Sequence, residues 1–446
     1  MTFLRLIACG VAFALTSCAV GPNYKRPVVD TPEQYRTPTD VAPANIPLAD
    51  TTVEPDVAFS MADLPWWEIF EDPVLVELVT TTLEQNYDLK IAVARTEQAS
   101  QQVTATRSAF FPQVSYDGSG RRTHYPIDQL PTRKATFTSF LGLLSVGWEL
   151  DVWGKIRRAN EAAKAAFLAS EDGQRGVLLS LVSQVSTLYF ELLQLDAQLA
   201  IAEEAVAAFH KTLDLFTRKY EGGVSSKRPV TRAAAAEAQA RAWVPDVRIQ
   251  IEVAENRLSV LLGRPPGPIP RGKPLIEQRL PDIPPGLPSQ LLERRPDIQR
   301  AEQGVVATNA QIGVAIGNFL PRVGLTALWG GTSDNLSDLA TGSANVWSIA
   351  AEFSGPIFRA GMLWAEYKAQ VALWEESKAV YEKTALQAFA DVSDSLTARS
   401  LLREQRMAFA DQSYQLSESV RLSLLRYDQG LASYFEVLQA QQELYP

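Results

Sequence analysis

The chain has 446 residues, of which 46% are hydrophobic and 21% are charged, and its net charge is −9. This length allows two to three domains. An acidic chain without a basic run argues against nucleic-acid binding. The only two cysteines stand at positions 9 and 18, which excludes a disulfide framework as the basis of the fold.

The N-terminus has the features of a lipoprotein signal peptide over residues 1–17. Arg5 precedes ten apolar or small residues, LIACGVAFAL. Such a run is long enough for a signal peptide and too short to span a membrane as a helix. Leu15-Thr16-Ser17 before Cys18 has the apolar-small-small form that a lipoprotein signal peptidase recognises. We therefore expect Cys18 to become the mature N-terminus and to carry a covalent lipid. The alternative is an ordinary signal peptide with a chance cysteine.

Proline marks two segments of irregular structure. Eight prolines fall between Pro22 and Pro65, which predicts an extended N-terminal arm over residues 18–65. Ten more fall between Pro265 and Pro296, which predicts a Pro-rich linker over residues 264–296. Because no later segment reaches 18 uninterrupted apolar residues, no membrane helix is expected after the signal peptide.

The two halves that the linker separates, residues 66–263 and 297–446, resemble each other. Asp88 and Asp297 each stand 24 residues before the proline of a similar phrase, FFPQV or NFLPRV. Further on, KYEGGVSS matches RYDQGLAS, and the offset is 209 residues early in the halves and 207 later. A near-constant offset predicts an internal two-fold repeat. We expect its first copy to contain a helix, a β-hairpin, a long helix and a return helix.

A long helix is expected in each half. Residues 362–429 contain no glycine or proline, which permits one helix on the order of 100 Å. Residues 155–221 lack proline, and their later part carries apolar residues at alternating steps of three and four. This spacing predicts a coiled-coil seam. The seam residues are Leu178, Leu181, Val185, Leu188, Leu192, Leu195, Leu199, Ala202, Val206, Phe209, Leu213, Phe216 and Tyr220. Arg399 and Arg406 interrupt the weaker register of the second half, which favours a helix with a wet face.

Ahead of each long helix the apolar period falls to two, which predicts β-strands. Apolar residues alternate from Val323 to Trp329 and from Trp347 to Phe353, and residues 140–150 also share an apolar face. The strand expected at 113–125 has a poorer pattern. Strands of roughly ten residues suit a membrane β-barrel, and the smallest bacterial barrels have about eight of them. Four strands per chain therefore require several chains for a barrel. The alternative is two hairpins on a soluble sheet.

The sequence does not point to catalysis. His124 and His210 have no partners at metal-ligand spacing. Gly118-Ser119-Gly120 lacks the third glycine of a nucleotide-binding loop and opens no helix. We expect no enzymatic activity, no metal and no cofactor apart from the lipid on Cys18.

Several phrases are similar to those of TolC-type outer-membrane efflux lipoproteins, the NodT-like branch of the outer-membrane factors of RND-type pumps. They are Cys18-Ala19-Val20-Gly21-Pro22-Asn23-Tyr24, PWWEIFEDPVL with Trp66, Trp67, Phe70 and Asp72, WELDVWGK at 148–155, and RRPDIQRAEQGVVATNAQIGVA at 294–315. The resemblance covers the chain from residue 15 almost to its end.

The resemblance implies a mainly α fold with β structure. It would be a TolC-like homotrimer with a shared 12-stranded transmembrane β-barrel, four strands per chain, continuing into a long periplasmic α-helical coiled-coil barrel. It further implies a passive exit duct in the outer membrane. A periplasmic adaptor (membrane fusion protein) and an inner-membrane transporter would be the partners, and small molecules such as drugs and toxic compounds the cargo. Ala19 is not the aspartate that retains lipoproteins in the inner membrane, so outer-membrane sorting is expected.

The resemblance also implies two sets of site residues. The adaptor would dock on helix tips at Gly222, Gly223, Gly430 and Leu431. The closed periplasmic aperture would be lined by Tyr427, Asp428, Glu436 and Gln439. Relatives carry aspartates at the last two positions, so the glutamine departs from the pattern and only Glu436 keeps a charge. Three-fold symmetry would turn this carboxylate into a cation-selective ring. The first repeat has Pro229 and Arg232 at these places, and the alternative is a solvated surface glutamate.

Other functions remain open at this stage. A secretion duct for peptides or proteins would use the same architecture. A periplasm-spanning structural coiled-coil lipoprotein would explain the helices and the lipid but not the alternating hairpins. At the offset of 207 residues the second repeat is about 24 residues short, so we also expect a stunted last helix and a weakened belt around the middle of the helical barrel.

Overall fold

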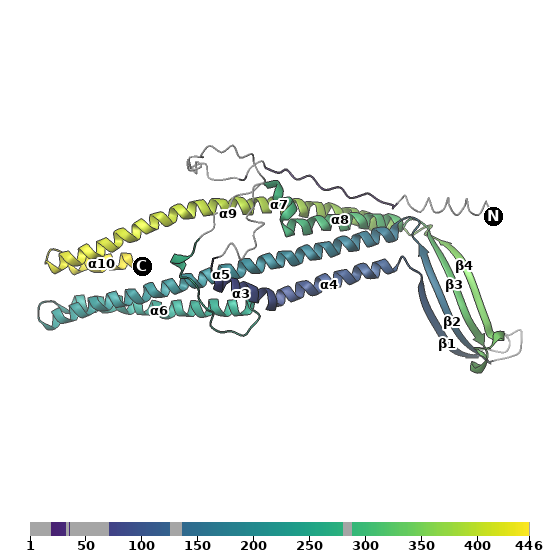
Figure 1. Ribbon diagram of the computed structural model, residues 1–446, viewed down its shortest axis with the longest axis horizontal. Helices are drawn as coiled ribbons and strands as arrows, with labels where there is room; N and C mark the ends of the chain where they lie inside the picture. The colour runs from purple at the N-terminus through teal and green to yellow at the C-terminus, as the bar shows by residue number, and fades with distance from the viewer. Residues whose placement is uncertain (1–18, 33–34, 36–70, 125–135, 280–287, 446) are drawn as a thin grey trace. The chain divides into compact units, whose positions relative to one another are not determined.

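The computed structural model describes residues 19–32, 35, 71–124, 136–279 and 288–445. These residues form long helices and one four-stranded sheet (Figure 1). The helices are α3 (Pro73–Gln85), α4 (Tyr87–Ser108), α5 (Lys155–Glu221), α6 (Lys227–Leu261), α7 (Pro288–Arg294), α8 (Pro296–Gly317), α9 (Met362–Asp428) and α10 (Tyr434–Leu444), with short 3-10 turns η3 (Leu275–Glu277), η4 (Leu336–Asp338) and η5 (Gly342–Ala344). The strands are β1 (Gln113–His124), β2 (Thr136–Leu150), β3 (Arg322–Ser333) and β4 (Asn345–Ser354). The signal peptide over 1–17, Cys18 and the motif residues Trp66, Trp67 and Phe70 lie outside the described residues.

The chain divides into two compact units. The first takes in residues 1–30, 92–174 and 292–386, and the second residues 31–91, 175–291 and 387–446. The first unit therefore holds the sheet, α8 and the strand-proximal parts of α4, α5 and α9. The second holds α3, α6, α10 and the remaining parts of α4, α5 and α9.

The two long helices agree with the prediction, since α5 and α9 contain 67 residues each. The predicted seam of α5 is its buried side. Seven of the seam residues are buried: Leu181, Val185, Leu192, Leu195, Ala202, Phe209 and Phe216. By contrast, all of residues 401–410 on α9 are exposed, including Leu402 and Arg406. The second repeat thus has the weaker seam that its sequence predicts.

The core of the second unit is formed by α3, α5 and α6. Leu75 and Val79 on α3 pack with Val185 and Leu192 on α5 and with Leu258 on α6, and all five are fully buried. Burial of one such side chain contributes roughly 1.5–3 kcal/mol. The α5 window of highest hydropathy satisfies the length and composition criteria for a membrane helix. Packing against α3 and α6 accounts for part of this apolar character without a membrane.

The segment predicted to be a linker is packed against this core over its first part. Ile269 is 3% exposed and belongs to the same cluster of buried residues. Its amide donates to Glu255 on α6 at 3.1 Å. The prolines of this segment prevent a long helix, but they do not make residues 264–279 a free tether.

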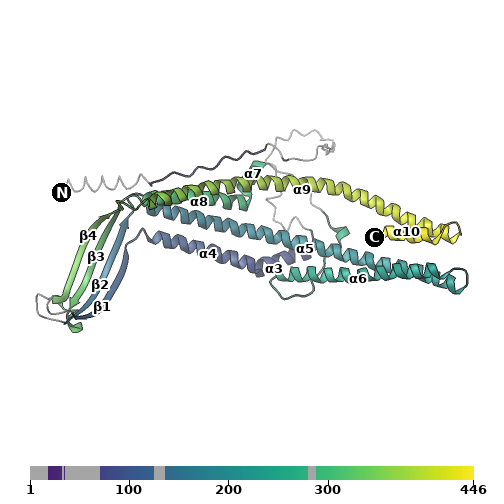
Figure 2. The same ribbon diagram turned by 180° about the vertical axis from the view of Figure 1, so that it is seen from behind.

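The four strands form one antiparallel sheet in the order β1-β2-β3-β4. The strand at 113–124 is present although its apolar pattern is weak. Pairing with β2 accounts for its full length, because every residue from Gln113 to His124 pairs with a residue of β2. Figure 2 shows the same sheet from behind, with β1 and β4 at its two edges.

Candidate functional site

One face of the sheet is apolar across all four strands. The register places Tyr116, Leu144, Trp329 and Trp347 in one row. The neighbouring rows on the same face hold Val114, Val146, Ala327 and Ile349, and then Trp148, Leu325 and Ala351. Several of these side chains are highly exposed, with Trp347 at 68% and Ile349 at 79%. A contiguous apolar surface of this kind requires an apolar partner, and a bilayer supplies one.

The opposite face of the sheet is polar and rich in small residues. One row holds Ser115, Ser145, Leu328 and Ser348, and the hydroxyls of the first two lie 2.7 Å apart. Another row crosses Glu149, Gly324 and Glu352. Polar residues on one face and apolar residues on the other match the alternation of a membrane barrel with a water-filled interior.

The predicted helix tips are two turns of nearly identical geometry. The α5–α6 turn has Gly223 at φ +73°, and the α9–α10 turn has Gly430 at φ +76°. In the first, the amide of Val224 donates to the carbonyl of Lys219 at 2.9 Å. In the second, the amide of Leu431 donates to the carbonyl of Arg426 at 2.8 Å. Both glycines take the left-handed conformation that ends a helix at low steric cost. The two copies of the predicted repeat therefore share the geometry of this turn.

Each turn exposes an aliphatic side chain directly after its left-handed glycine. Val224 is 81% exposed and Leu431 is 67% exposed. Val224 was not among the predicted site residues, although the offset of 207 residues pairs it with Leu431. Gly222 is one of the predicted site residues. Its amide donates to the Arg218 carbonyl at 2.9 Å and closes the first turn.

The predicted aperture residues lie beside the second turn. The ring of Tyr427 packs edge-on against Phe216 with ring centres 5.6 Å apart, and the Lys219 ammonium lies 4.1 Å from the centre of the Tyr427 ring. Asp428 is the last residue of α9 and is exposed. Gln439 is exposed on α10 and donates to Glu443 at 3.0 Å.

Glu436 has a local structural role in addition to any role at an aperture. It is the third residue of α10 and forms a capping box with Ser433. Its carboxylate also lies 3.9 Å from the Arg426 guanidinium. Both contacts hold the carboxylate at the first turn of the helix, next to the free backbone amides.

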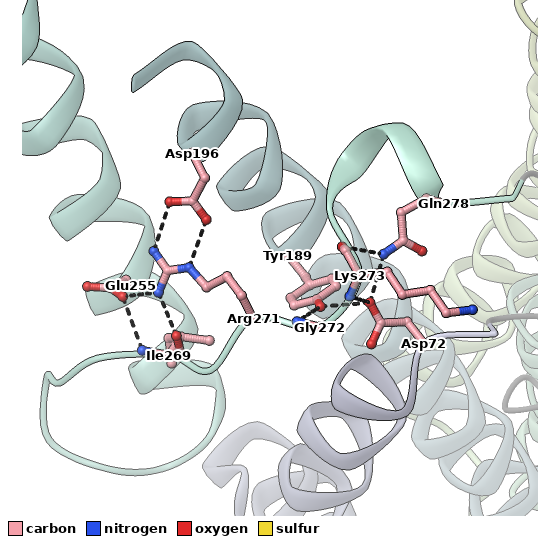
Figure 3. A network of polar contacts seen from close by, with 9 residues as sticks. All are labelled: Asp72, Tyr189, Asp196, Glu255, Ile269, Arg271, Gly272, Lys273 and Gln278. Carbon is pink, nitrogen blue, oxygen red and sulfur yellow. Dashed lines mark hydrogen bonds and ion pairs between the residues drawn. The ribbon is translucent and has the colours of Figure 1, made fainter. Parts of the chain in front are cut away.

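A buried carboxylate, Asp72, joins three segments of the second unit (Figure 3). The Asp72 side chain caps α3 by accepting from the Val74 amide at 3.0 Å. It also accepts from the Tyr189 hydroxyl of α5 at 2.8 Å and from the Gln278 amide group at 2.7 Å. Although burial opposes the charge, these hydrogen bonds lower the pKa of Asp72. The pKa of Tyr189 is raised by burial and by its bond to Asp72.

Arg271 makes the neighbouring contacts in Figure 3. Its guanidinium bonds Asp196 of α5 at 2.9 Å and also contacts Glu255 of α6. Gly272 donates its amide to the Tyr189 hydroxyl at 2.9 Å, and a side chain at position 272 would overlap the Asp72 carboxylate. Residues 271–278 are thereby held against α3, α5 and α6. Of this network the sequence had singled out only Asp72, because contacts between distant segments leave no periodic signal.

The described part of the N-terminal arm crosses the first unit along α5 and α8. The amide of Val20 donates to the carbonyl of Trp153 at 2.9 Å. The buried Arg158 guanidinium donates to the carbonyl of Val20 and to the Asn23 side chain. Gly21, at φ +98°, lies so close to Gly313 of α8 that a side chain would clash with the α8 backbone. Residues 19–23 are therefore fixed next to the junction of β2 and α5.

The two histidines make single polar contacts. His124 lies 3.0 Å from the Thr136 hydroxyl, and His210 lies 3.2 Å from Glu237. Within residues 19–32, 35, 71–124, 136–279 and 288–445, no cluster of three or more His, Cys, Asp or Glu side chains could hold a metal ion.

Comparisons with known proteins agree with this geometry. The family model "Outer membrane efflux protein" matches residues 78–264 and 287–446. The chain is 34% identical to the solvent efflux pump outer membrane protein SrpC of Pseudomonas putida, over 97% of this chain and 90% of that protein. It is 30% identical to the cation efflux system protein CusC of Escherichia coli, over 100% and 94%. Its structure is similar to the crystal structure of the MtrE outer membrane channel of Neisseria gonorrhoeae, with a TM-score of 0.82, 28% identity and coverage of 96% and 92%.

Proposed function

The chain belongs to the outer membrane efflux protein family, and from this premise we propose how its parts divide the work of export. It has the fold of the trimeric TolC-like channels and acts as the outer-membrane component of an efflux system. Its strands cross the outer membrane and its helices extend into the periplasm.

The apolar face of the sheet is the observation that supports a location in the membrane. Four strands leave two open edges, β1 and β4, and an edge in a bilayer must be paired. Three copies of the chain pair these edges and give twelve strands around a polar interior. A periplasmic structural lipoprotein would need neither the apolar face nor the hairpins.

We assign small toxic molecules to the duct as cargo. Relatives are named for the efflux of solvents, toluene, antibiotics and cations. Such different cargoes suit a passive, polar-lined duct, in which an inner-membrane transporter supplies the energy and the selection. No feature of the described residues favours peptides or proteins as cargo.

The helix tips are the proposed docking points for the periplasmic adaptor. Val224 and Leu431 present one exposed aliphatic side chain on each turn, so the trimer presents six. Apolar anchors at the centre of a contact contribute more to affinity than rim charges do.

The test replaces both side chains, Val224→Asp with Leu431→Asp. We expect the trimer to form normally, adaptor capture in detergent to fall at least about tenfold, and toxic-compound resistance to be lost. Ile276→Asp is the control, because Ile276 is also highly exposed, at 94%, but lies on η3 and not on either turn. Full capture and resistance in the double variant would refute docking at the tips.

The lipid on Cys18 is the second proposal. Because Ala19 and Val20 are held at the β2–α5 junction, a lipid on the preceding residue starts next to the membrane-facing strands. Cys18→Ser should abolish acylation and leave the signal peptide uncleaved at that site. Mass spectrometry of the wild-type N-terminus decides the point, and an unmodified terminus at another position would contradict the proposal.

A further inference from the structure

A cavity of about 640 Å³ opens on the first unit between α4, α5 and α8. This volume lies in the range of about 300–1,000 Å³ that is typical of small-molecule sites. Its walls are mainly apolar, with basic side chains among them. The lining includes Val103, Arg107, Phe110, Lys164, Leu168 and Val306.

Two charged residues of the cavity are already neutralised. Arg157 bonds the Asp151 carboxylate at 3.1 Å. Glu161 pairs with the buried Arg158 at 2.8 Å. These four side chains therefore leave no net charge for a ligand.

Two further cations in the cavity are not neutralised. Arg107 on α4 and Lys164 on α5 are both exposed, and neither side chain makes a hydrogen bond or ion pair with any residue that the structure describes. A guanidinium and an ammonium group on an apolar wall match an anionic group attached to an apolar chain.

The cavity borders the membrane-facing side of the sheet. Phe110 lines the cavity, and its carbonyl accepts a hydrogen bond at 3.0 Å from the indole of Trp148. Trp148 belongs to the apolar face of β2, close to the end of the strand where the periplasmic helices begin. Tryptophan at this depth is typical of the interfacial aromatic belt of a membrane protein. The cavity therefore lies at the level of lipid headgroups.

We propose that this cavity binds an anionic phospholipid of the periplasmic leaflet, with a headgroup of the phosphatidylglycerol class. The phosphate lies between Arg107 and Lys164, and the upper part of an acyl chain packs on Phe110, Leu168 and Val306. A lipid on Cys18 would not replace it, because that lipid has no phosphate and would leave both cations unpaired. The inference rests on the membrane location and is independent of the cargo and of adaptor docking.

The test uses the full-length trimer, delipidated in mild detergent and titrated with dioleoyl phosphatidylglycerol in native mass spectrometry. The variant is Arg107→Gln with Lys164→Gln. We expect its affinity for this lipid to fall by about tenfold or more, because two charge-assisted hydrogen bonds are lost. The charge-preserving pair Arg107→Lys with Lys164→Arg should bind within about threefold of the wild type.

Two controls make the result specific. Lys211→Gln with Arg241→Gln removes two exposed cations from α5 and α6 in the second unit and should leave binding unchanged. Leu168→Gln keeps both cavity cations and changes only the apolar wall. It should therefore weaken the binding of the lipid but not the binding of inorganic phosphate. Phosphatidylcholine should bind more weakly than phosphatidylglycerol in the wild type and equally weakly in the double Gln variant.

Three outcomes would overturn the proposal. Unchanged phosphatidylglycerol affinity in the double Gln variant would show that the two cations do not hold the headgroup. Competition by inorganic phosphate at the lipid's own concentration would identify the site as one for free anions. Failure of the wild-type trimer to retain any phosphatidylglycerol above the level of phosphatidylcholine would show that the cavity does not select an anionic headgroup. Adaptor capture and drug resistance should be unaffected in all variants, so the two proposals can fail separately.

Discussion

Asp72 is a single residue that fixes the start of α3, the middle of α5 and the segment after α6 together. Its carboxylate accepts from the Val74 amide, the Tyr189 hydroxyl and the Gln278 side chain, and the residue is only 1% exposed. A buried carboxylate with this many donors stabilises the fold only while it is ionised.

Asp72→Asn should therefore destabilise the protein by about 2 kcal/mol, because the new amide group would face donors. The folded-state pKa is lowered, so the charge stabilises the fold above the ordinary Asp pKa of about 3.9 and this contribution is lost as pH falls through the folded value. Thermal unfolding should be measured from pH 7 to pH 3. The difference in melting temperature between the wild type and Asp72→Asn should shrink toward pH 3.

Glu252→Gln on α6 is the matched control for that series, since the Glu252 side chain is exposed and makes no hydrogen bond or ion pair with the residues that the structure describes. It should follow the wild type at every pH. If the melting temperatures of the wild type and Asp72→Asn differed by the same amount from pH 7 to pH 3, the Asp72 carboxylate would not be the titrating group.

At the scale of the elements, the sequence predicts best where one repeating pattern dominates. The absence of prolines and the three-four spacing predicted α5 and α9, and the period of two predicted β3 and β4. The strand at 113–124 is a weaker prediction, because glycine and polar residues alternate over 117–120 and no apolar residue follows Tyr116 within the strand. Its formation depends on pairing with β2. The contacts of Asp72, Arg271 and the arm residues 19–23 could not be predicted, since each joins segments far apart in the chain.

The two faces of β4 make a direct test of its orientation in the membrane. Ile349 lies in the apolar rows, whereas the preceding Ser348 lies in a polar row. Ile349→Lys should cost about 2–4 kcal/mol near the middle of the bilayer and reduce the yield of heat-resistant trimer. Ser348→Lys introduces the same side chain one residue away and should leave that yield nearly unchanged, because it points to the wet interior. Equal losses in both variants would contradict the assignment of the faces.

At the scale of the whole molecule, three-fold symmetry multiplies each feature of the chain. Each sheet contributes four strands with two open edges, so closure depends on its neighbours and stable barrels and trimers form together. The same symmetry places three copies of every residue of the second turn around one axis. A single charge per chain at that level becomes a ring.

Glu436 is the residue whose three symmetric copies should have a measurable effect. If the α10 carboxylates form the ring that the family resemblance implies, they attract cations and repel anions at the constriction. Glu436→Gln is the informative change, because glutamine can keep the capping-box contact with Ser433 and removes only the charge. We expect single-channel recordings in planar bilayers to show lower cation selectivity and weaker block by multivalent cations. Glu252→Gln, which removes an exposed charge from α6 and not from α10, should change neither. If Glu436→Gln conducts with wild-type selectivity, the carboxylate serves only the helix cap and the contact with Arg426.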